Sequence, residues 1–399
     1  MSRRPLDGVR VLELGQLVAG PFAGTILAYF GADVVKVEPP EGDPLRTWRL
    51  VERGTSLWWR SIGRNKRSVV LDLRTEPGRA AARRLALQSD VLIENFKPGT
   101  LEAWGLDPAS LRAERPSLIV VRVSGYGQTG PHAHRPGYAS VAEAVAGLRS
   151  VLGFPDRPPA RANLSLGDTL AGIQAAMGAL LALYERDAGR RDGRPAGGEG
   201  QVVDVALTES VLGVLESMLP EADRGVVRGR AGTTITGIAP SNTYGTRDGR
   251  WVVIGANSEG NFARLMRAMD RPDLADDPGL RGNPGRVARS AELDDAIGAW
   301  AQARDAVDIV ALLDRASVPA GVVQDARDLL ACPQLRARGA LEQVEVDGRP
   351  LTVGALPPRL ERTPGRSSWA GPELGAHTQD VMKEWLGEGL DAPPEPRGP

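Results

Sequence analysis

The sequence predicts an α/β protein with a Rossmann-like domain, because strand-like apolar segments alternate with helix-like segments over its first half. The first such unit is a strand at 9–14, a loop at 15–20, a helix, and a second strand at 32–38. Pro21 lies in the first turn of this helix and Gly31 follows its last turn, positions that these residues favour. The order strand–loop–helix–strand is typical of the βαβ unit that opens a Rossmann-like domain.

The alternation of strand-like and helix-like segments continues to about residue 220 and is then replaced by a different pattern. Polar residues at 221–234 indicate a linker, a smaller α+β unit is expected at about 235–325, and residues after Gly389 are expected to be disordered. The other expected strands are 68–73, 91–94, 118–123, 201–207, 251–255 and 341–346. The other expected helices are 76–88, 169–185, 208–218, 262–269 and 291–304.

Composition excludes several classes of function. A net charge of −1 over 399 residues provides no overall field that would attract nucleic acid or an anionic membrane. The single cysteine, Cys332, excludes an internal disulfide and a cysteine-rich zinc site, and it favours a cytoplasmic location. The three histidines argue against a histidine-rich metal site. No apolar run reaches the ~18 residues that span a bilayer, so membrane insertion is not expected.

Two blocks carry the first indication of a binding site. Residues 64–74 and 93–100 each run a strand into a loop that holds a cation and a small polar side chain. The chain has only 4 lysines against 45 arginines, yet Lys66 and Lys97 lie inside these blocks and Lys36 lies just upstream. Loops at the carboxyl edge of a parallel sheet are common sites for phosphorylated ligands. The blocks therefore predict such a site, with chance placement of the lysines as the alternative.

Three loops have both a structural and a functional interpretation. The 15–20 loop, with Glu38 ending the next strand, resembles a dinucleotide site but lacks the second glycine of the fingerprint, so NAD binding is not expected. The glycine-rich loop 124–131 is either a turn or a segment that brings backbone amides to a ligand. The loop 255–262 is either a turn or an active-site lid.

Asp168 stands at the start of the expected long helix. In the structural interpretation it is the N-cap of that helix. In the functional interpretation the positive end of the helix dipole keeps its carboxylate ionised and available as a nucleophile. The neighbouring Gly167 then leaves space for an incoming ligand.

Eight segments in order resemble the family III CoA-transferases, which include formyl-CoA transferase, carnitine CoA-transferase and the related 2-methylacyl-CoA racemases. The resemblance extends from about residue 9 to 386. The segments are LELGQLVAGP (12–21), GADVVKVEPPEGDPLR (31–46), RNKRSVVLDLR (64–74), IENFKPGT (93–100), SGYGQTGP (124–131), LGDTLAG (166–172), GQVVDVAL (200–207) and LGAHTQDVMKEWLG (374–387).

The resemblance implies a particular architecture. A large Rossmann-like CoA-binding domain would be built from 1–220 and 330–390, a small α+β domain from 225–325, and 390–399 would be a disordered tail. Two ring-like chains would interlock as a homodimer, with the active site where a large domain meets the partner's small domain. A CoA thioester and a small carboxylic acid would be the substrates, without a metal or a further cofactor.

The resemblance also assigns roles to residues. Asp168 falls on the catalytic aspartate. The residues expected to contact CoA are Leu17, Val18, Ala19, Leu71, Arg74, Asn95, Phe96, Lys97 and Tyr138. The residues expected to form an active-site loop are Gly255, Asn257 and Gly260.

Two departures from the family pattern bear on the activity. Racemases carry a His-Asp pair where this chain has Tyr138 and Ala139, which removes one of the two groups needed to exchange an α-proton. Some members carry arginines where this chain has Pro39 and Ala103. Phosphate binding is therefore expected to depend on the remaining cations, which are Arg64, Arg74 and Lys97.

The expected function is an acyl-CoA:carboxylate CoA-transferase that works through an aspartyl-CoA intermediate, with succinyl-CoA as a candidate donor. One alternative is a 2-methylacyl-CoA racemase or isomerase. The other is a non-catalytic CoA-binding protein, in which Asp168 would be only a helix cap.

Overall fold

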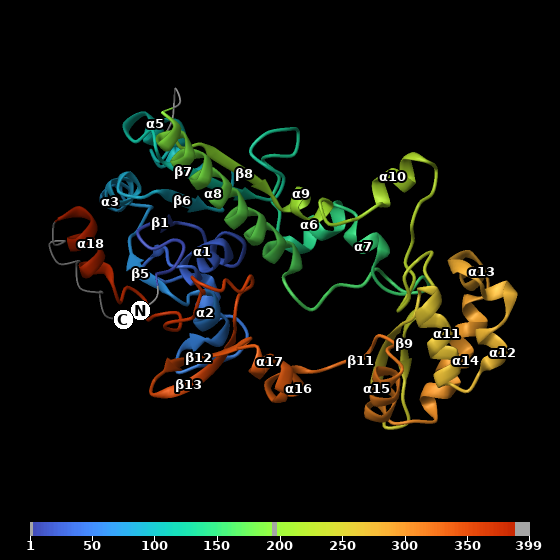
Figure 1. The fold of residues 1–399 in the computed structure, drawn as a ribbon. Coiled ribbons are helices and arrows are strands. Elements are labelled where there is room, and N and C mark those ends of the chain that lie inside the picture. Colours follow the sequence, from blue (N-terminus) through green and yellow to red (C-terminus); the bar gives the residue numbers. More distant parts are fainter. Residues whose placement is uncertain (1–2, 194–197, 388–399) are drawn as a thin grey trace. The chain divides into compact units, whose positions relative to one another are not determined.

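The chain divides into two compact units in the computed structural model, which describes residues 3–193 and 198–387 (Figure 1). The large unit combines Met1–Leu148, Ala162–Glu216 and Gln334–Pro399, and the small unit combines Arg149–Arg161 and Ser217–Pro333. Residues 149–161 therefore group with the small unit, whereas the sequence analysis assigned them to the large domain. The expected tail at 390–399 lies outside the described residues.

A six-stranded parallel sheet forms the centre of the large unit. Its order is β5-β2-β1-β6-β7-β8, the doubly wound order in which the direction of the chain switches between β1 and β6. The strands are β1 (Arg10–Glu13), β2 (Asp33–Glu38), β5 (Lys66–Val70), β6 (Val91–Glu94), β7 (Ile119–Ser124) and β8 (Val202–Ala206). They are rich in valine and isoleucine, as expected of strands covered on both faces. The predicted α/β class with a large parallel sheet is confirmed.

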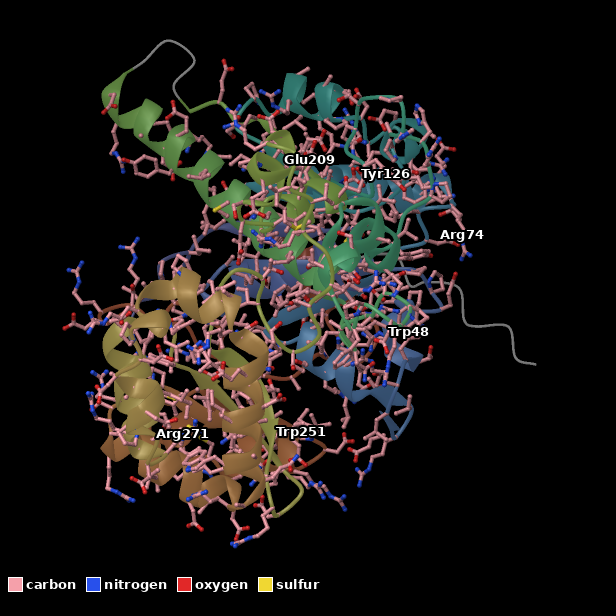
Figure 2. The ribbon with its side chains drawn as sticks, turned by 90° about the vertical axis from the view of Figure 1, so that its right-hand side faces the viewer. Trp48, Arg74, Tyr126, Glu209, Trp251 and Arg271 are labelled. Atoms are coloured by element: carbon pink, nitrogen blue, oxygen red, sulfur yellow. The ribbon has the colours of Figure 1, made fainter. Side chains whose placement is uncertain are left out.

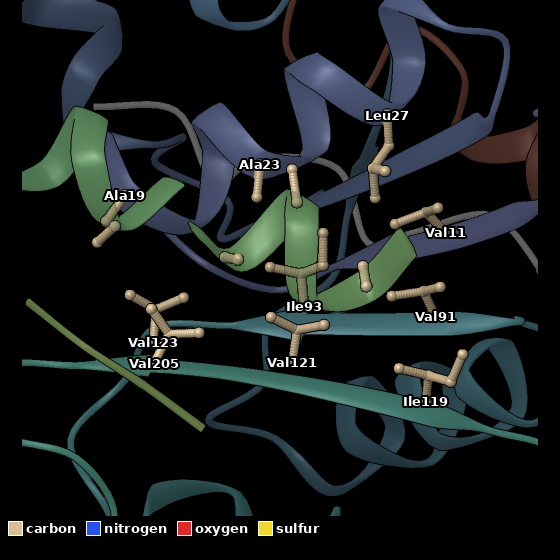
Figure 3. Packing of buried hydrophobic residues seen from close by; sticks show 14 of the residues in the cluster. Val11, Ala19, Ala23, Leu27, Val91, Ile93, Ile119, Val121, Val123 and Val205 are labelled. Carbon is tan, nitrogen blue, oxygen red and sulfur yellow. The ribbon is translucent and has the colours of Figure 1, made fainter. Parts of the chain in front are cut away.

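Two helices cover one face of this sheet, α1 (Ala19–Tyr29) and α8 (Leu166–Asp192) (Figure 3). Alanines on both helices, including Ala23 and Ala175, are buried against strand residues such as Val121. Among the described residues α8 alone has the length and apolar composition of a membrane span. Its alanine face is already buried against α1 and the sheet, which accounts for much of that apolar character.

The other face carries α3 (Glu76–Leu87), α5 (Pro108–Glu114) and the C-terminal helix α18 (Thr378–Leu386). Leu85, Val381 and Trp385 pack with Leu12 and Leu92 of the sheet. Because α18 lies beside β5 and α3, the end of the chain returns to its N-terminal sheet (Figure 1).

Short elements complete the large unit. The strands are β3 (Val51–Glu52), β4 (Thr55–Ser56), β12 (Leu341–Val346) and β13 (Arg349–Gly354). The helices are η1 (Pro44–Thr47), α2 (Leu57–Ile62), α4 (Thr100–Ala103), α6 (Ala139–Val145) and α9 (Leu207–Leu212). The helices α7 (Leu148–Val151) and α17 (Pro333–Ala337) lie at boundaries between the units.

The small unit is an α+β structure with its own core. Its antiparallel sheet has the order β11-β10-β9. Ile254, Phe262, Leu293 and Ile309 are buried together in that core. The strands are β9 (Ser241–Gly245), β10 (Trp251–Gly255) and β11 (Ala320–Val322), and the helices are α10 (Met218–Asp223), α11 (Glu259–Ala268), α12 (Pro272–Ala275), η2 (Pro278–Leu280), α13 (Gly282–Ala288), α14 (Ser290–Gln302), α15 (Ala306–Arg315) and α16 (Ala326–Ala331).

Two helix predictions were wrong at their ends. Helix α8 continues to Asp192 instead of ending at Glu185, because Arg186 is buried and donates to Asp90 Oδ1 at 2.9 Å, so this charged segment belongs to the helix. The helix expected at 208–218 is shorter than predicted, because α9 ends at Leu212 with Gly213 as its C-cap, and α10 begins only at Met218.

Candidate functional site

The loops that follow β1 and β6 meet at the switch point of the sheet. Asn95 Oδ1 accepts a hydrogen bond from the Gln16 N–H at 2.7 Å, and its Nδ2 donates to the Gln16 carbonyl at 2.8 Å. A Cβ on Gly15 would lie 2.5 Å from Asn95 Oδ1, so only glycine permits this approach. The structure therefore brings Asn95 together with the predicted loop at 17–19. The polar atoms of Asn95 are used to hold that loop.

Leu17 is held in an unusual conformation within this loop. Its φ is 64°, in the left-handed region that residues with a Cβ rarely adopt. Its N–H donates to the Asp43 carboxylate, with both oxygens at 3.2 Å. Leu17 also packs against a small cluster formed by Val18, Leu45 and Ile62. The loop is thus fixed through its backbone and through its side chains.

Phe96 and Lys97 follow Asn95; Phe96 packs against other residues, whereas Lys97 is exposed. The Phe96 ring meets Trp104 edge-on at a centroid distance of 5.0 Å, and its N–H donates to Glu94 Oε2 at 2.8 Å. Lys97 is exposed and has no ion pair among residues 3–193 and 198–387. Its ammonium group is therefore available to a phosphate.

Glu94 is a buried carboxylate directly beneath this loop. Burial raises its pKa to about 7, although Arg122 lies 2.7 Å away and opposes the shift. Arg122 also reaches Glu102 at 2.7 Å, so it is shared between two carboxylates. This group titrates near neutral pH at the point where the loop begins.

Leu71 and Arg74 follow β5, on the other side of the sheet centre. Leu71 is buried in the core. The Arg74 side chain is 62% exposed at the surface (Figure 2) and pairs with Asp72 at 2.7 Å and Glu41 at 2.9 Å. These carboxylates raise its pKa and compete with any phosphate for its guanidinium. Arg74 thus lies at the predicted edge of the sheet, but its guanidinium group already forms ion pairs with Asp72 and Glu41.

Lys36 and Lys66 are structural cations, contrary to the prediction that they mark a phosphate site. Both are completely buried. Lys36 Nζ lies 2.9 Å from Asp43 and 3.5 Å from Glu13. Lys66 Nζ lies 2.8 Å from Glu13 and donates to the Pro21 carbonyl at 2.6 Å, and burial lowers its pKa to about 8. Their charges are used inside the protein, where a ligand cannot reach them.

Arg64 is likewise excluded from phosphate binding. It is 4% exposed and donates to the Gly354 carbonyl at 3.1 Å and to Ser61. The neighbouring Asn65 accepts from the Ser368 N–H at 2.6 Å. The block at 64–74 therefore fastens the C-terminal segment to the sheet, and its only exposed candidate cation is Arg74.

Asp168 lies at the third position of α8 and is not its N-cap. Ser165 occupies the N-cap position without a side-chain cap hydrogen bond, and Asp168 is half-buried in the first turn. Glu143 of α6 is buried and accepts the Gly167 N–H at 3.2 Å, so a neighbouring helix supplies the missing cap. A carboxylate in the first turn is stabilised as an anion by the helix dipole. Asp168 is thus a half-buried carboxylate at a helix position that favours its anionic form.

The glycines of this helix explain how it is positioned. A Cβ on Gly167 would lie 3.2 Å from the Ala139 carbonyl, so this glycine permits contact with α6 and does not leave space for a ligand. A Cβ on Gly172 would lie 2.8 Å from the Ala19 carbonyl. Asp168 is one turn before Gly172 on the same face of α8. The turn that carries Asp168 therefore adjoins the point where α8 touches the 17–19 loop.

Tyr138 and the glycine-rich loop lie after β7. The Tyr138 side chain is 67% exposed at the start of α6. Within the loop, Gln128 donates its N–H to Asp204 at 2.9 Å, so one of the amides expected to face a ligand already has a partner. A Cβ on Gly125 would lie 3.1 Å from Gly137 Cα, which shows how closely these two segments approach.

Gly255, Asn257 and Gly260 belong to the small unit. They form the connection from β10 to α11, where Ser258 caps the helix by accepting the Asn261 N–H at 3.3 Å. The Asn257 carbonyl accepts from Arg286 at 2.8 Å, and its side chain is exposed. Within its own unit this loop is a capped turn with an exposed outer surface.

Sequence reasoning missed Gln16, Asp43 and Glu143. Asp43 had a local signal only as a helix cap, because it precedes Pro44 and accepts the Leu45 N–H at 2.9 Å, whereas its contacts with Leu17 and Lys36 are tertiary. Glu143 had one, since it is the single charged residue in the apolar helix 139–145. The described residues contain no cluster of three or more histidine, cysteine, aspartate or glutamate side chains that could hold a metal ion.

Comparison with known proteins agrees with this doubly wound fold, whose ligands bind at the switch point. The sequence matches CoA-transferase family III over residues 6–378. It is 46% identical to succinyl-CoA–D-citramalate CoA-transferase of Chloroflexus aurantiacus, over 96% of this chain and 94% of that one. It is 34% identical to succinate–glutarate CoA-transferase of Agrobacterium fabrum, over 95% of each.

A solved CAIB/BAIF family protein from Brucella suis superimposes with a TM-score of 0.84 and 34% identity, covering 96% of this chain and 100% of that one. The chain belongs to CoA-transferase family III. The resemblance seen in the sequence is thereby confirmed, and so is the prediction that the protein is an enzyme that transfers CoA between acyl-CoA and carboxylate.

Proposed function

We propose that the protein transfers CoA from succinyl-CoA to a dicarboxylic acid of four or five carbons, with D-citramalate as the first acceptor to test. The names of its relatives carry this proposal. They include succinyl-CoA–D-citramalate, succinyl-CoA–L-malate, succinate–glutarate and succinyl-CoA:mesaconate CoA-transferases, at identities from 46% to 33%. Every acceptor in this group is a short dicarboxylate.

Asp168 is the proposed nucleophile. Its carboxylate attacks the succinyl-CoA carbonyl, which forms a mixed anhydride and releases CoA thiolate. The thiolate then attacks the aspartyl carbonyl, which releases succinate and leaves an aspartyl-CoA thioester. The acceptor carboxylate attacks this thioester and expels the thiolate, which finally attacks the acceptor carbonyl and regenerates Asp168. The energy of the thioester is retained throughout because each step is an acyl exchange.

The CoA moiety is proposed to lie along the carboxyl edge of the sheet. Its contacts would come from the loops after β1, β5 and β6, with Arg74 and Lys97 as the phosphate-binding cations. Strands β5 and β6 are three strand spacings apart, roughly 14 Å, so these two cations would contact separate parts of an extended ligand. Tyr138 would line the acyl end of the site. The loop with Gly255, Asn257 and Gly260 is proposed to be an active-site loop, as the family resemblance implies.

The assembly is proposed to be an interlocked homodimer in the cytoplasm. Helix α8 leaves Ile173, Met177, Leu181 and Tyr184 between 46% and 69% exposed, at spacings that place them on one face. An apolar stripe of this kind on a core helix is typical of a surface covered by another chain. We propose no cofactor beyond the CoA substrate and no metal.

The decisive experiment incubates the enzyme with succinyl-CoA and each of a panel of carboxylates, with mass analysis of the CoA products. The expected product is the CoA thioester of a short dicarboxylate, formed with one succinate per turnover. Products from monocarboxylates alone would contradict the proposed acceptor class. Light scattering should give twice the chain mass of 42.4 kDa.

A further inference from the structure

Three consecutive residues of the loop after β1 are each held by a different side chain, and two of these side chains, Lys36 and Asp43, are buried. The Lys36 ammonium donates to the Gly15 carbonyl. The Asn95 carboxamide pairs with both backbone groups of Gln16. The Asp43 carboxylate accepts the Leu17 N–H. These contacts come from β2, from the loop after β2 and from the loop after β6, so the backbone at 15–17 is fixed from several directions.

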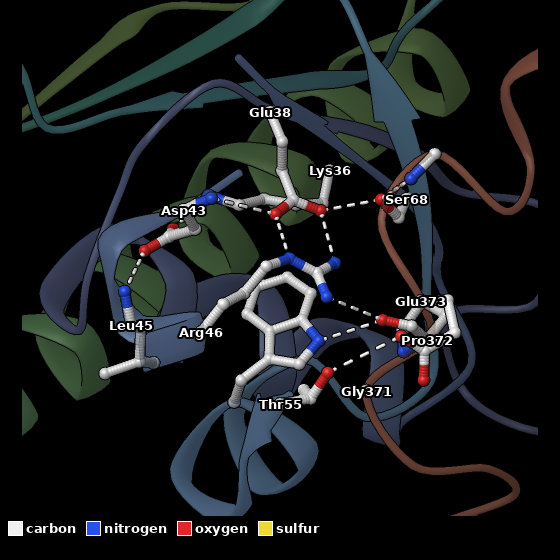
Figure 4. Close-up of polar contacts among 12 residues, drawn as sticks. Lys36, Glu38, Asp43, Leu45, Arg46, Thr55, Ser68, Gly371, Pro372 and Glu373 are labelled. Atoms are coloured by element: carbon white, nitrogen blue, oxygen red, sulfur yellow. Dashed lines mark hydrogen bonds and ion pairs between the residues drawn. The ribbon is translucent and has the colours of Figure 1, made fainter. Parts of the chain in front are cut away.

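The two charged members of this set form a buried ion pair. Lys36 Nζ and Asp43 Oδ2 are 2.9 Å apart, and both side chains are completely buried. Asp43 is itself held, because its N–H donates to Glu38 Oε2 at 3.0 Å, and Glu38 pairs with Arg46 at 2.6 Å (Figure 4). The pair therefore belongs to a preorganised network.

Burying this network lowers the stability of the folded protein, and its geometry alone does not explain why the buried charges are present. Buried ion pairs are often no more stable than apolar residues of equal volume, because two charges must be taken out of water. Here both charged side chains make hydrogen bonds to backbone atoms of one loop, the loop at 15–17. Leu17 is the strained point of that loop, and strained backbone persists only where its surroundings determine it, commonly at ligand sites.

We propose that Asp43 and Lys36 are positioning residues for CoA transfer, which fix the backbone at 15–17 in the conformation that receives the CoA thioester. This inference rests on the proposed placement of CoA at that loop. Neither side chain can touch the substrate, because both are buried. Asp43 and Lys36 can therefore act on the substrate only through the loop at 15–17. Their substitution should weaken binding of the CoA substrate more than binding of the acceptor.

The test compares Asp43→Ala with the conservative Asp43→Asn and with a control ion pair that joins β5 to β2. The control is Arg67→Met, because Arg67 pairs with Asp33 at 2.6 Å near the opposite edge of the sheet. For Asp43→Ala we expect the KM for succinyl-CoA to rise about tenfold to a hundredfold, the range for a lost charged hydrogen bond. The kcat and the acceptor KM should change less than about threefold. Asp43→Asn should be intermediate, since its amide oxygen still accepts one hydrogen bond.

Hydrogen exchange of the peptide covering 14–22 provides a readout independent of activity. The amides of Gln16 and Leu17 should exchange faster in both Asp43 variants and at the wild-type rate in Arg67→Met. The inference would be overturned if Asp43→Asn showed unchanged hydrogen exchange at 14–22 and a KM for succinyl-CoA within twofold of wild type. An equal rise of this KM in Arg67→Met would also overturn it. If wild-type enzyme does not use succinyl-CoA, the proposed donor is wrong, whereas the exchange result still decides the positioning role.

Discussion

Substitution of Gly172 by alanine tests whether the spacing between α1 and α8 sets the geometry of the active site. The added Cβ would lie 2.8 Å from the Ala19 carbonyl and 3.0 Å from Phe22 Cβ. An ordinary contact is about half an ångström longer, so α8 must move by about that amount. Overpacking of this kind costs about 1–3 kcal/mol. Better helix propensity returns up to about 1 kcal/mol, which leaves a net loss of about 0–2 kcal/mol.

The activity should fall further than the stability. Asp168 lies one turn from Gly172, and a displacement of 1 Å can lower a rate about a hundredfold. A shift of about half that size predicts a kcat roughly tenfold lower. The assays are urea unfolding and steady-state CoA transfer.

The matched control is Gly298→Ala in α14, where the nearest atom to the added Cβ is Tyr244 Cδ1 at 3.9 Å. Because this position has room, alanine should stabilise the small unit by about 0.5–1 kcal/mol. Its CoA transfer should remain at the wild-type rate. If Gly172→Ala is as stable and as active as wild type, the spacing between α1 and α8 does not control the site and the reasoning is refuted.

Four further outcomes are expected. Asp168→Ala and Asp168→Asn should lose nearly all CoA transfer while remaining folded, and turnover within about tenfold of wild type, ~1.4 kcal/mol of barrier, would exclude the aspartyl intermediate. Lys97→Ala should raise the KM for the CoA thioester more than Arg74→Ala does, because Arg74 already has two carboxylate partners; equal effects would contradict this. The enzyme should not incorporate deuterium at the α-carbon of 2-methylacyl-CoA, because Tyr138 and Ala139 stand where the racemases carry their His-Asp pair, and exchange as fast as CoA transfer would revive the racemase. The pKa of Glu94 is raised to about 7 in the folded protein, so its stabilising effect is present below about pH 4.5 and is lost as the pH rises through 7. Urea unfolding should therefore show stability falling between pH 5 and 8, and Glu94→Gln should flatten that fall.

Local sequence patterns determined most of the architecture. The strands at 91–94, 251–255 and 341–346 are formed by the residues predicted, and helices α1 and α3 of the large unit were found within a few residues. Hydrophobic periodicity and glycine or proline boundaries suffice for this, because they act within one element. The family was also readable from eight ordered segments, and with it the transfer of CoA.

Other features needed the tertiary structure. The blocks at 64–74 and 93–100, with Lys36 just upstream, were interpreted as a phosphate site. However, Lys36 and Lys66 are buried, and only Lys97 is free among the candidate cations of the described residues. The sequence alone could not separate the three lysines, because each lies in a strand or just after one, and they differ only in the residues that the fold brings near them. The partners Glu13 and Asp43 come from other segments of the chain.

The same holds for the proposed catalytic residue. The sequence placed Asp168 at a helix start but not its position within the first turn, nor the buried Glu143 that caps that turn from α6. It also did not show that Gly167 and Gly172 are required by contacts with Ala139 and Ala19. A residue type and its helix follow from local pattern, whereas the charge state, partners and spacing of a side chain depend on segments distant in the sequence.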